Sequence, residues 1–287
     1  MLELDYNAVL VNGTKIKMKA IIFSGTHSRH LYVHSEVVKH FDKVLIIVMK
    51  REELLPIPPP ELSAHDLKNF ELHFSSRKIV EDEKYGNINP QKIFERQEVV
   101  YVNPNELNTH KIAEKVKNFN ADFCFIFGTC LILEPIISIL PKNKINLHLG
   151  LSPWYKGSAT LFWPFYFLQP QFVGITFHQI TENPDAGEII HQCVPELKHG
   201  DSIHTVAAKC VIKAKNDIPI LINHFKKQKK FSGLQQKTTG RVWRGLDFHA
   251  SHLRVIYDLF DNKIVDAYLD GKLEQNLPKI FSCLNKK

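Results

Sequence analysis

Five short apolar runs, separated by helical or irregular segments, constrain the fold of this chain more than any other feature. They are residues 19–24, 43–49, 99–102, 122–127 and 144–148. The runs are nearly continuous rather than alternating, which is typical of strands that are buried on both faces. Such strands, joined by helices, predict an α/β fold with a doubly wound, mostly parallel, Rossmann-like sheet. Right-handed crossovers would bring the carboxyl ends of the strands to one edge, where ligands bind in sheets of this kind.

After residue 150 the pattern changes, and the chain gains additions around the main sheet. The runs 172–180 and 188–194 predict two more strands joined by a turn, and 202–227 predicts a long amphipathic helix. Beyond this, the sequence predicts a helix over 247–259 and a short strand over 264–269. We divide the chain into an N-terminal extension, a main domain and a small C-terminal appendage: residues 1–18, 19–232 and 233–287.

A net charge of +7 and a pI near 9.0 favour anionic ligands such as phosphates or polycarboxylates. The lysines are scattered, and the one dense run, 226–230, is typical of a helix end, so no nucleic-acid partner is expected. The five cysteines form no CxxC pair and no secretory signal precedes them, which indicates reduced thiols in a cytoplasmic protein. The apolar stretch 123–140 is broken by Gly128 and Pro135, so no membrane span is expected.

A helix is predicted in the long connection over residues 50–98, after the proline-rich segment 56–60. His73, Arg77, Glu81 and Tyr85 recur at every fourth position and lie on one stripe. Two interpretations stay open: an exposed face of ion pairs, or the lining of a substrate entrance that Arg77 contacts.

Three side chains suited to acyl transfer are predicted to meet at the carboxyl edge of the sheet. Asn146 and His148 are two apart at the end of the fifth run, so they project to one side, and Asp185 arrives on a loop constrained by Pro184 and Gly187. An amide or an imidazolium can stabilise an oxyanion, and a His–carboxylate pair can move protons on and off nitrogen. No recognisable Ser or Cys nucleophile lies beside a base, which favours direct transfer to an amine.

Asn-x-His with a distant aspartate is equally typical of a buried structural histidine. The choice between a catalytic and a structural role therefore depends on the surrounding motifs. INLHLGLSPWYKG (145–157), GITFHQI (174–180) and NPDAGEIIHQ (183–192) together resemble the signature of the folate-dependent formyltransferases. The resemblance extends over about residues 19–225 and is specific between 144 and 192.

The resemblance implies an enzyme that transfers a formyl group from N10-formyltetrahydrofolate, as co-substrate, to a primary amine. It implies that Asn146 and His148 hold and polarise the formyl group and that Asp185 organises proton transfer beside the pterin. The backbone of residues 127–133 would bind the pterin ring, with Gly128, Cys130, Leu131 and Leu133 as its named positions. Substrate-binding candidates are Arg77, Lys156 and His178, the last of which is equally compatible with a structural role. No metal ligand set is expected.

Two departures from the family pattern concern the loop that faces the acceptor. Leu149-Gly150-Leu151 stands where Pro-Ser-Leu is common, and Lys156 where arginine is usual. A small residue at 150 keeps the loop tight, so we expect the folate chemistry to be retained and the acceptor to differ.

Within the family, acceptors include glycinamide ribonucleotide, initiator methionyl-tRNA and nucleotide-linked amino sugars, and a sister branch hydrolyses formyl-folate. Residues 24–27 are less glycine-rich than the phosphate loop of the glycinamide enzyme, and 233–287 is too short for the barrel of the tRNA enzyme. An amino sugar, free or nucleotide-linked, is therefore the expected acceptor, with a glycinamide ribonucleotide formyltransferase, another amine formyltransferase or a formyl-folate hydrolase as alternatives.

Two alternatives from other classes also remain. A catalytically silent folate-binding module would keep the fold without the reaction. A nicotinamide-dependent oxidoreductase is disfavoured because residues 24–26 do not form G-x-G-x-x-G and no acidic residue closes the second strand. The sequence leaves the oligomeric state open.

Overall fold

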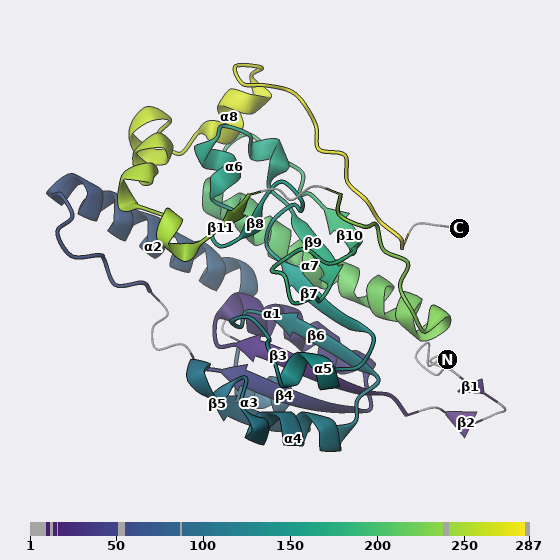
Figure 1. Ribbon diagram of the computed structural model, residues 1–287. Helices are drawn as coiled ribbons and strands as arrows, with labels where there is room; N and C mark the ends of the chain where they lie inside the picture. Colours follow the sequence, from purple (N-terminus) through teal and green to yellow (C-terminus); the bar gives the residue numbers. More distant parts are fainter. Residues whose placement is uncertain are drawn as a thin grey trace, which may run out of the picture.

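A seven-stranded sheet flanked by helices forms the centre of the computed structural model (Figure 1). The described residues are 10–11, 14–15, 17–50, 55–86, 88–237 and 241–284. The strand order is β10-β9-β7-β6-β3-β4-β5. In chain order these strands are β3 (Lys19–Gly25), β4 (Lys43–Met49), β5 (Glu98–Val102), β6 (Phe123–Phe127), β7 (Lys144–His148), β9 (Ile175–Gln179) and β10 (Ile189–Cys193).

Five of these strands, from β5 to β7 across the sheet, run parallel, whereas β9 and β10 are antiparallel additions at one edge. The predicted α/β fold with a mostly parallel sheet is thus confirmed. Two small strand pairs lie outside the sheet. β1 (Leu10–Val11) pairs with β2 (Thr14–Lys15), and β8 (Lys156–Gly157) pairs in parallel with β11 (Val242–Trp243).

Two apolar layers cover the faces of the sheet, because successive side chains of each strand point to opposite sides. In β3, Ala20 and Ile22 belong to one layer, and Ile21 and Phe23 to the other. The larger layer includes α1 (Ser28–Val37) and α7 (Ile203–Gln228), and the smaller includes α4 (His110–Phe119) and α5 (Ile136–Ile139). Both faces are therefore wound with helices, as the continuous apolar runs predicted.

The remaining helical segments lie mostly in the connections. They are α2 (Ala64–Tyr85), α3 (Pro90–Phe94), α6 (Trp163–Tyr166), α8 (Ile264–Leu269), the 3-10 turns η1 (Val38–His40), η2 (Pro104–Glu106), η3 (Pro170–Phe172), η4 (Gly245–Asp247) and η5 (Ala250–His252), and the π-helical turn η6 (Val255–Leu259). Serine caps define the starts of the two longest helices. Ser63 accepts a hydrogen bond from the backbone of Asp66 in α2, and Ser202 from that of Thr205 in α7.

The apolar stretch 123–140 folds as a strand, an irregular loop and the short helix α5, as Gly128 and Pro135 predict. Across the described ranges, no helix combines the length and apolar character that a bilayer crossing needs.

The C-terminal segment packs on the larger apolar layer and lies alongside α2 and α6 (Figure 1). Leu253, Ile256, Ile264 and Val265 are buried in that layer, and Cys283 donates its backbone N–H to the carbonyl of Ile190 at 2.9 Å. The tail thus completes the core beside β10.

One expectation for this tail was wrong and another was confirmed in part. Residues 264–269 form helix α8 rather than a strand, because Ile264, Val265 and Tyr268 are buried together at helical spacing. The predicted helix over 247–259 is present over residues 250–259, where the 3-10 turn η5 continues without a break into the π-helical turn η6. At its start, the ring of His252 accepts a hydrogen bond from the backbone N–H of His249 at 3.1 Å, and the turn η4 lies before it as a separate piece.

Candidate active site

The end of β7 brings two of the predicted site residues beside the antiparallel strand β9. Asn146 pairs with His178 in the sheet register, and His148 with Thr176. The side-chain nitrogen Nδ2 of Asn146 lies 3.1 Å from Nε2 of His178. His148 and His178 are both buried, with ring centroids 6.4 Å apart. The two histidines thus face one small region at the carboxyl end of β7.

Asp185 reaches this region from the loop before β10, where its backbone adopts a φ of 48°. One carboxylate oxygen, Oδ2, lies 3.4 Å from Nδ1 of His148 and accepts the backbone N–H of Gly157 at 2.8 Å. The other, Oδ1, lies 3.2 Å from Nε2 of His178. Asn146, His148 and Asp185 therefore lie together, and His178 joins them.

The protonation of His148 follows from its contacts. Nε2 is 2.8 Å from the carbonyl oxygen of Tyr155, so this nitrogen donates a hydrogen bond and Nδ1 is left facing Asp185. Burial lowers the pKa of His148, and the Asp185 carboxylate and the Tyr155 carbonyl only partly oppose this effect. The nearby charge of Lys156 lowers it further. A neutral imidazole can accept a proton on the nitrogen that faces the carboxylate.

Asp185 stays ionised despite its burial. Burial alone would raise the pKa of this carboxyl group, but His148, His178 and the N–H of Gly157 outweigh it and lower the pKa below its usual value. The carboxylate is therefore a fixed negative charge between two imidazoles.

His178 makes close contacts through both ring nitrogens. Nδ1 lies 2.8 Å from the carbonyl oxygen of Gln179 and donates to it. Nε2 lies 3.1 Å from Nδ2 of Asn146 and 3.2 Å from Oδ1 of Asp185. The ring of His178 therefore connects Asn146 to Asp185.

The loop after His148 is held by side chains of β9 and β10. Thr176 donates its hydroxyl to the carbonyl of Gly150 at 2.8 Å and accepts the N–H of Ser152 at 3.0 Å. Gln192 donates to the carbonyl of Ser152 at 2.5 Å. These contacts explain why the threonine and glutamine of the two strand motifs lie near the site, which the sequence did not reveal.

Lys156 and Gly157 at the end of this loop form β8 and are largely enclosed. Lys156 is buried, so this candidate substrate ligand does not project into open solvent. Gly157 has a φ of 91°, and a Cβ there would lie 2.1 Å from the carbonyl oxygen of Trp243. Only glycine fits this left-handed position against β11.

The loop after β6 carries the four predicted pterin-binding positions. Cys130, Leu131 and Leu133 are exposed, and Gly128 lies against the ring of His30. The side chain of Asn108 donates to the carbonyl of Leu131 and accepts the N–H of Leu133, each at 2.9 Å. Asn108 therefore fixes the loop backbone, a role that no sequence motif indicated.

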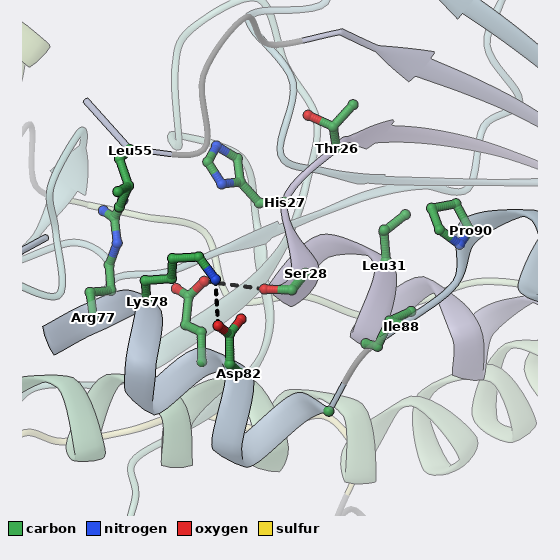
Figure 2. Close-up of a pocket in the computed structure, with 12 residues that line it drawn as sticks. Thr26, His27, Ser28, Leu31, Leu55, Arg77, Lys78, Asp82, Ile88 and Pro90 are labelled. Atoms are coloured by element: carbon green, nitrogen blue, oxygen red, sulfur yellow. Dashed lines mark hydrogen bonds and ion pairs between the residues drawn. The ribbon is translucent and has the colours of Figure 1, made fainter. Parts of the chain in front are cut away.

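A cavity of about 510 Å³ opens beside the turn between β3 and α1 (Figure 2). Its lining comes from that turn, from α2 and from the segments that flank α2: Thr26, His27, Ser28, Leu31, Leu55, Arg77, Lys78, Glu81, Asp82, Gly86, Ile88 and Pro90. Lys78 pairs with Asp82, and Glu81 pairs with Arg29 at 2.7 Å.

Arg77 is the cation of this cavity that has no carboxylate partner among the described residues. Its guanidinium lies over the ring of Phe74, 4.7 Å from the centroid. Burial, with a smaller contribution from the charge of Arg29, lowers the pKa of Arg77 to about 10, so it stays charged at neutral pH.

The predicted stripe on α2 faces inward, so its interpretation as an exposed ion-pair face was wrong. His73 and Tyr85 are buried, and Glu81 pairs with a residue of α1 rather than within the stripe. The stripe turns inward because α2 packs on α1 and α7.

Within the described ranges, one group of side chains has metal-ligand atoms close together, namely His191, Cys193 and Asp217, all within 4.8 Å. His191 lies 3.0 Å from Asp217 through Nε2 and 2.8 Å from the hydroxyl of Ser282 through Nδ1. The group already satisfies its own hydrogen-bonding capacity, which is the pattern of a structural cluster.

Comparison with known proteins gives the site a family context. A 125-residue stretch is 29% identical to methionyl-tRNA formyltransferase of Buchnera aphidicola and covers 42% of this chain but only 39% of that protein. The chain thus matches about two fifths of the length of that curated relative.

Two solved structures share the fold. A glycinamide ribonucleotide transformylase from Symbiobacterium toebii has a TM-score of 0.52 at 14% identity, over 76% of this chain and 95% of its own. A sugar N-formyltransferase from a Shewanella species has a TM-score of 0.53 at 14% identity, over 83% and 87%. At this level of identity the likeness concerns the fold alone. The sequence model described as formyl transferase, however, matches residues 72–221, more than half of the chain, and the protein therefore belongs to the formyl transferase family.

Proposed function

We propose that the protein transfers a formyl group from N10-formyltetrahydrofolate to the primary amine of an amino sugar, free or nucleotide-linked. The observation that carries this proposal is the convergence of Asn146, His148 and Asp185 at the carboxyl end of β7. Family membership supports the reaction class, and the carboxyl edge of a parallel sheet is where such folds bind ligands.

The groups of the site that can accept and donate protons suit direct transfer. The amine attacks the formyl carbon, the carbonyl oxygen becomes an oxyanion, and the amine nitrogen must lose a proton. His148 accepts that proton at Nδ1, where Asp185 Oδ2 stabilises the resulting imidazolium. The same proton then goes to N10 of the folate as the C–N bond to the formyl carbon breaks. The amide of Asn146 donates to the oxyanion.

The donor would lie against the loop after β6, which includes the half-buried Gly128 and the exposed Cys130. Asn108 already occupies the carbonyl of Leu131 and the N–H of Leu133. Recognition of the pterin edge would therefore use the other backbone groups of this loop, and Leu131 and Leu133 would supply apolar contact.

The cavity beside α1 supports an acceptor with an anionic or polyhydroxylated end. β3 and β7 are separated by one strand, so their carboxyl ends lie about 10 Å apart. An acceptor with its amine at His148 can thus reach Arg77 and the hydroxyls of Thr26 and Ser28. Arginine without a carboxylate partner is well suited to phosphate, and the neighbouring carboxylates suit sugar hydroxyls.

The size of the cavity also supports a nucleotide-linked amino sugar, because a volume of about 510 Å³ is large enough for a small anionic ligand.

A screen of amines tests the proposal. Purified protein is incubated with formyl-tetrahydrofolate and, one at a time, nucleotide-linked amino sugars, free amino sugars and glycinamide ribonucleotide, and the formylated product is identified by mass spectrometry. We expect product with an amino sugar and none with His148→Ala. Product with glycinamide ribonucleotide alone would contradict the amino-sugar acceptor and identify glycinamide ribonucleotide in its place. Hydrolysis of formyl-tetrahydrofolate without any acceptor would indicate a hydrolase.

A further inference from the structure

Gln236, which lies in the C-terminal tail beyond the part matched by the family model, makes an unusual pair of contacts with the Asp185 loop. Its side-chain nitrogen Nε2 donates to the carbonyl of Asp185 at 2.8 Å and to that of Gly187 at 2.7 Å. Both partners are acceptors, so the orientation of the amide is unambiguous: the NH2 group must face them.

The same tail also pairs with Gly157, whose backbone N–H donates to the Asp185 carboxylate. Val242–Trp243 pairs in parallel with Lys156–Gly157, and the carbonyl of Trp243 accepts the N–H of Ser158 at 2.7 Å. The indole of Trp243 stacks on that of Trp163 with centroids 4.2 Å apart, and Arg241 lies 3.9 Å above it. β11 is thus anchored in the core, and it fixes the backbone of Gly157.

Further contacts extend the tail along the Asp185 loop. Leu234, two residues before Gln236, exchanges two backbone hydrogen bonds with Ile189, of 2.8 and 2.9 Å. The tail therefore contacts both ends of the bond between Gly157 N–H and Asp185 Oδ2: Gln236 and Leu234 on the carboxylate side, and β11 on the amide side.

We propose that Gln236 is a positioning residue that sets the place of Asp185 relative to His148, with β11 holding the opposite side of the same contact. Asp185 needs such support because its left-handed backbone, φ of 48°, is unfavourable for a residue with a side chain. A small displacement would open the distance of 3.4 Å to His148, and a shift of about 1 Å can cost about a hundredfold in rate. The catalytic part of this inference rests on the proposed function.

Gln236→Glu is the sharpest variant, since it keeps the shape but replaces the donating NH2 with a carboxylate that faces two carbonyls. Gln235→Glu is its matched control, because Gln235 is the exposed neighbour and receives the same charge. Gln236→Leu removes the donors without adding charge. Circular dichroism and thermal melting on all three full-length variants establish that they fold.

The first measurement needs no acceptor: the amide proton shift and hydrogen exchange of Gly157 by NMR. We expect an upfield shift and faster exchange in both Gln236 variants, and no change in Gln235→Glu, because only the former displace the acceptor of that N–H. An unchanged Gly157 amide in Gln236→Glu would overturn the inference, whether or not the protein transfers formyl groups.

The second measurement is steady-state transfer with formyl-tetrahydrofolate and the amine found in the screen. We expect kcat to fall between about tenfold and a hundredfold in Gln236→Glu, less in Gln236→Leu, with KM for the folate within about twofold. A shifted amide with unchanged kcat would refute the catalytic role. If the Gly157 amide shifts in the Gln236 variants but the wild-type protein transfers no formyl group, the positioning role of Gln236 stands and the proposed reaction is refuted.

Discussion

Asp185→Asn tests the centre of the proposed chemistry, because it removes one charge and almost no volume. In the wild type, the carboxylate lies 3.4 Å from His148 Nδ1 and 3.2 Å from His178 Nε2. Asparagine can keep the contact with the N–H of Gly157 through its oxygen, so the loop should hold its place. What is lost is the negative charge that stabilises a protonated His148.

The size of the loss follows from Coulomb's law. A unit pair separated by 3.4 Å at an effective dielectric constant near 20 interacts by about 5 kcal/mol, which corresponds to between three and four powers of ten in rate. This figure is a ceiling, because water and neighbouring dipoles compensate part of the lost charge. General acid–base contributions are typically about 10²–10⁴-fold, so we expect kcat to fall about a thousandfold.

The pH profile supplies a second signature. In the proposed mechanism His148 acts as a base, which requires its neutral form, so activity should rise as the pH passes its pKa and then level off. The Asp185 carboxylate raises that pKa against the larger effect of burial. Its removal should therefore move the acid limb to lower pH while the plateau falls.

Rapid-quench transfer of ¹⁴C-formyl from labelled folate to the identified amine measures both effects, with Glu182→Gln as the control. Glu182 is exposed on the same loop and loses the same charge. A kcat for Asp185→Asn within about threefold of wild type would refute the assigned role, as would an equal loss in Glu182→Gln.

Three further outcomes can be checked. Gly157→Ala should lower the melting temperature by several degrees and reduce kcat, since its φ of 91° and a Cβ only 2.1 Å from a backbone oxygen leave no room, whereas Gly245→Ala, with open space around it, should be neutral in the same melting assay. Arg77→Ala should raise KM for the acceptor about tenfold with kcat nearly unchanged, because Arg77 lines the cavity. Arg96→Ala, at an exposed arginine elsewhere, should leave that KM unchanged, and an unchanged KM in Arg77→Ala would contradict a place for Arg77 in the substrate site. Burial lowers the pKa of His204 to about 3 in the folded protein, whereas the same histidine in the unfolded chain binds a proton below about pH 6.5. The free energy of unfolding in urea should therefore fall between pH 7 and pH 5, and it should fall less steeply in His204→Gln.

The fold was predictable because its strands are buried on both faces and leave an unmistakable apolar pattern. The runs over 19–24 and 43–49 match β3 and β4 almost residue for residue. Short apolar pieces far from the sheet carry less information. The residues of α8, IVDAYL, fit a strand as well as a helix, and the choice was made by packing of Ile264, Val265 and Tyr268 on one side.

The site was predictable only where its residues belong to regular structure or to a motif. The two-residue spacing of Asn146 and His148 on a strand fixes their common direction. Gln236, Asn108 and Trp243 act through backbone atoms of distant loops, and such contacts leave no periodicity in the sequence. They could be found only once the chain had folded.

The two histidines of the site also distinguish a catalytic from a structural reading. A structural histidine in a core needs one hydrogen bond to be satisfied, and each ring has one from the backbone: His148 to Tyr155 and His178 to Gln179. Folding does not require their second nitrogens to converge on a single buried carboxylate, which costs free energy to desolvate. Here both converge on Asp185, and the carboxyl group is held ionised between them. Packing alone gives no reason to bury a carboxylate between two imidazoles. Such a carboxylate can stabilise a proton on either ring, which is expected at a site where proton transfer accompanies the reaction.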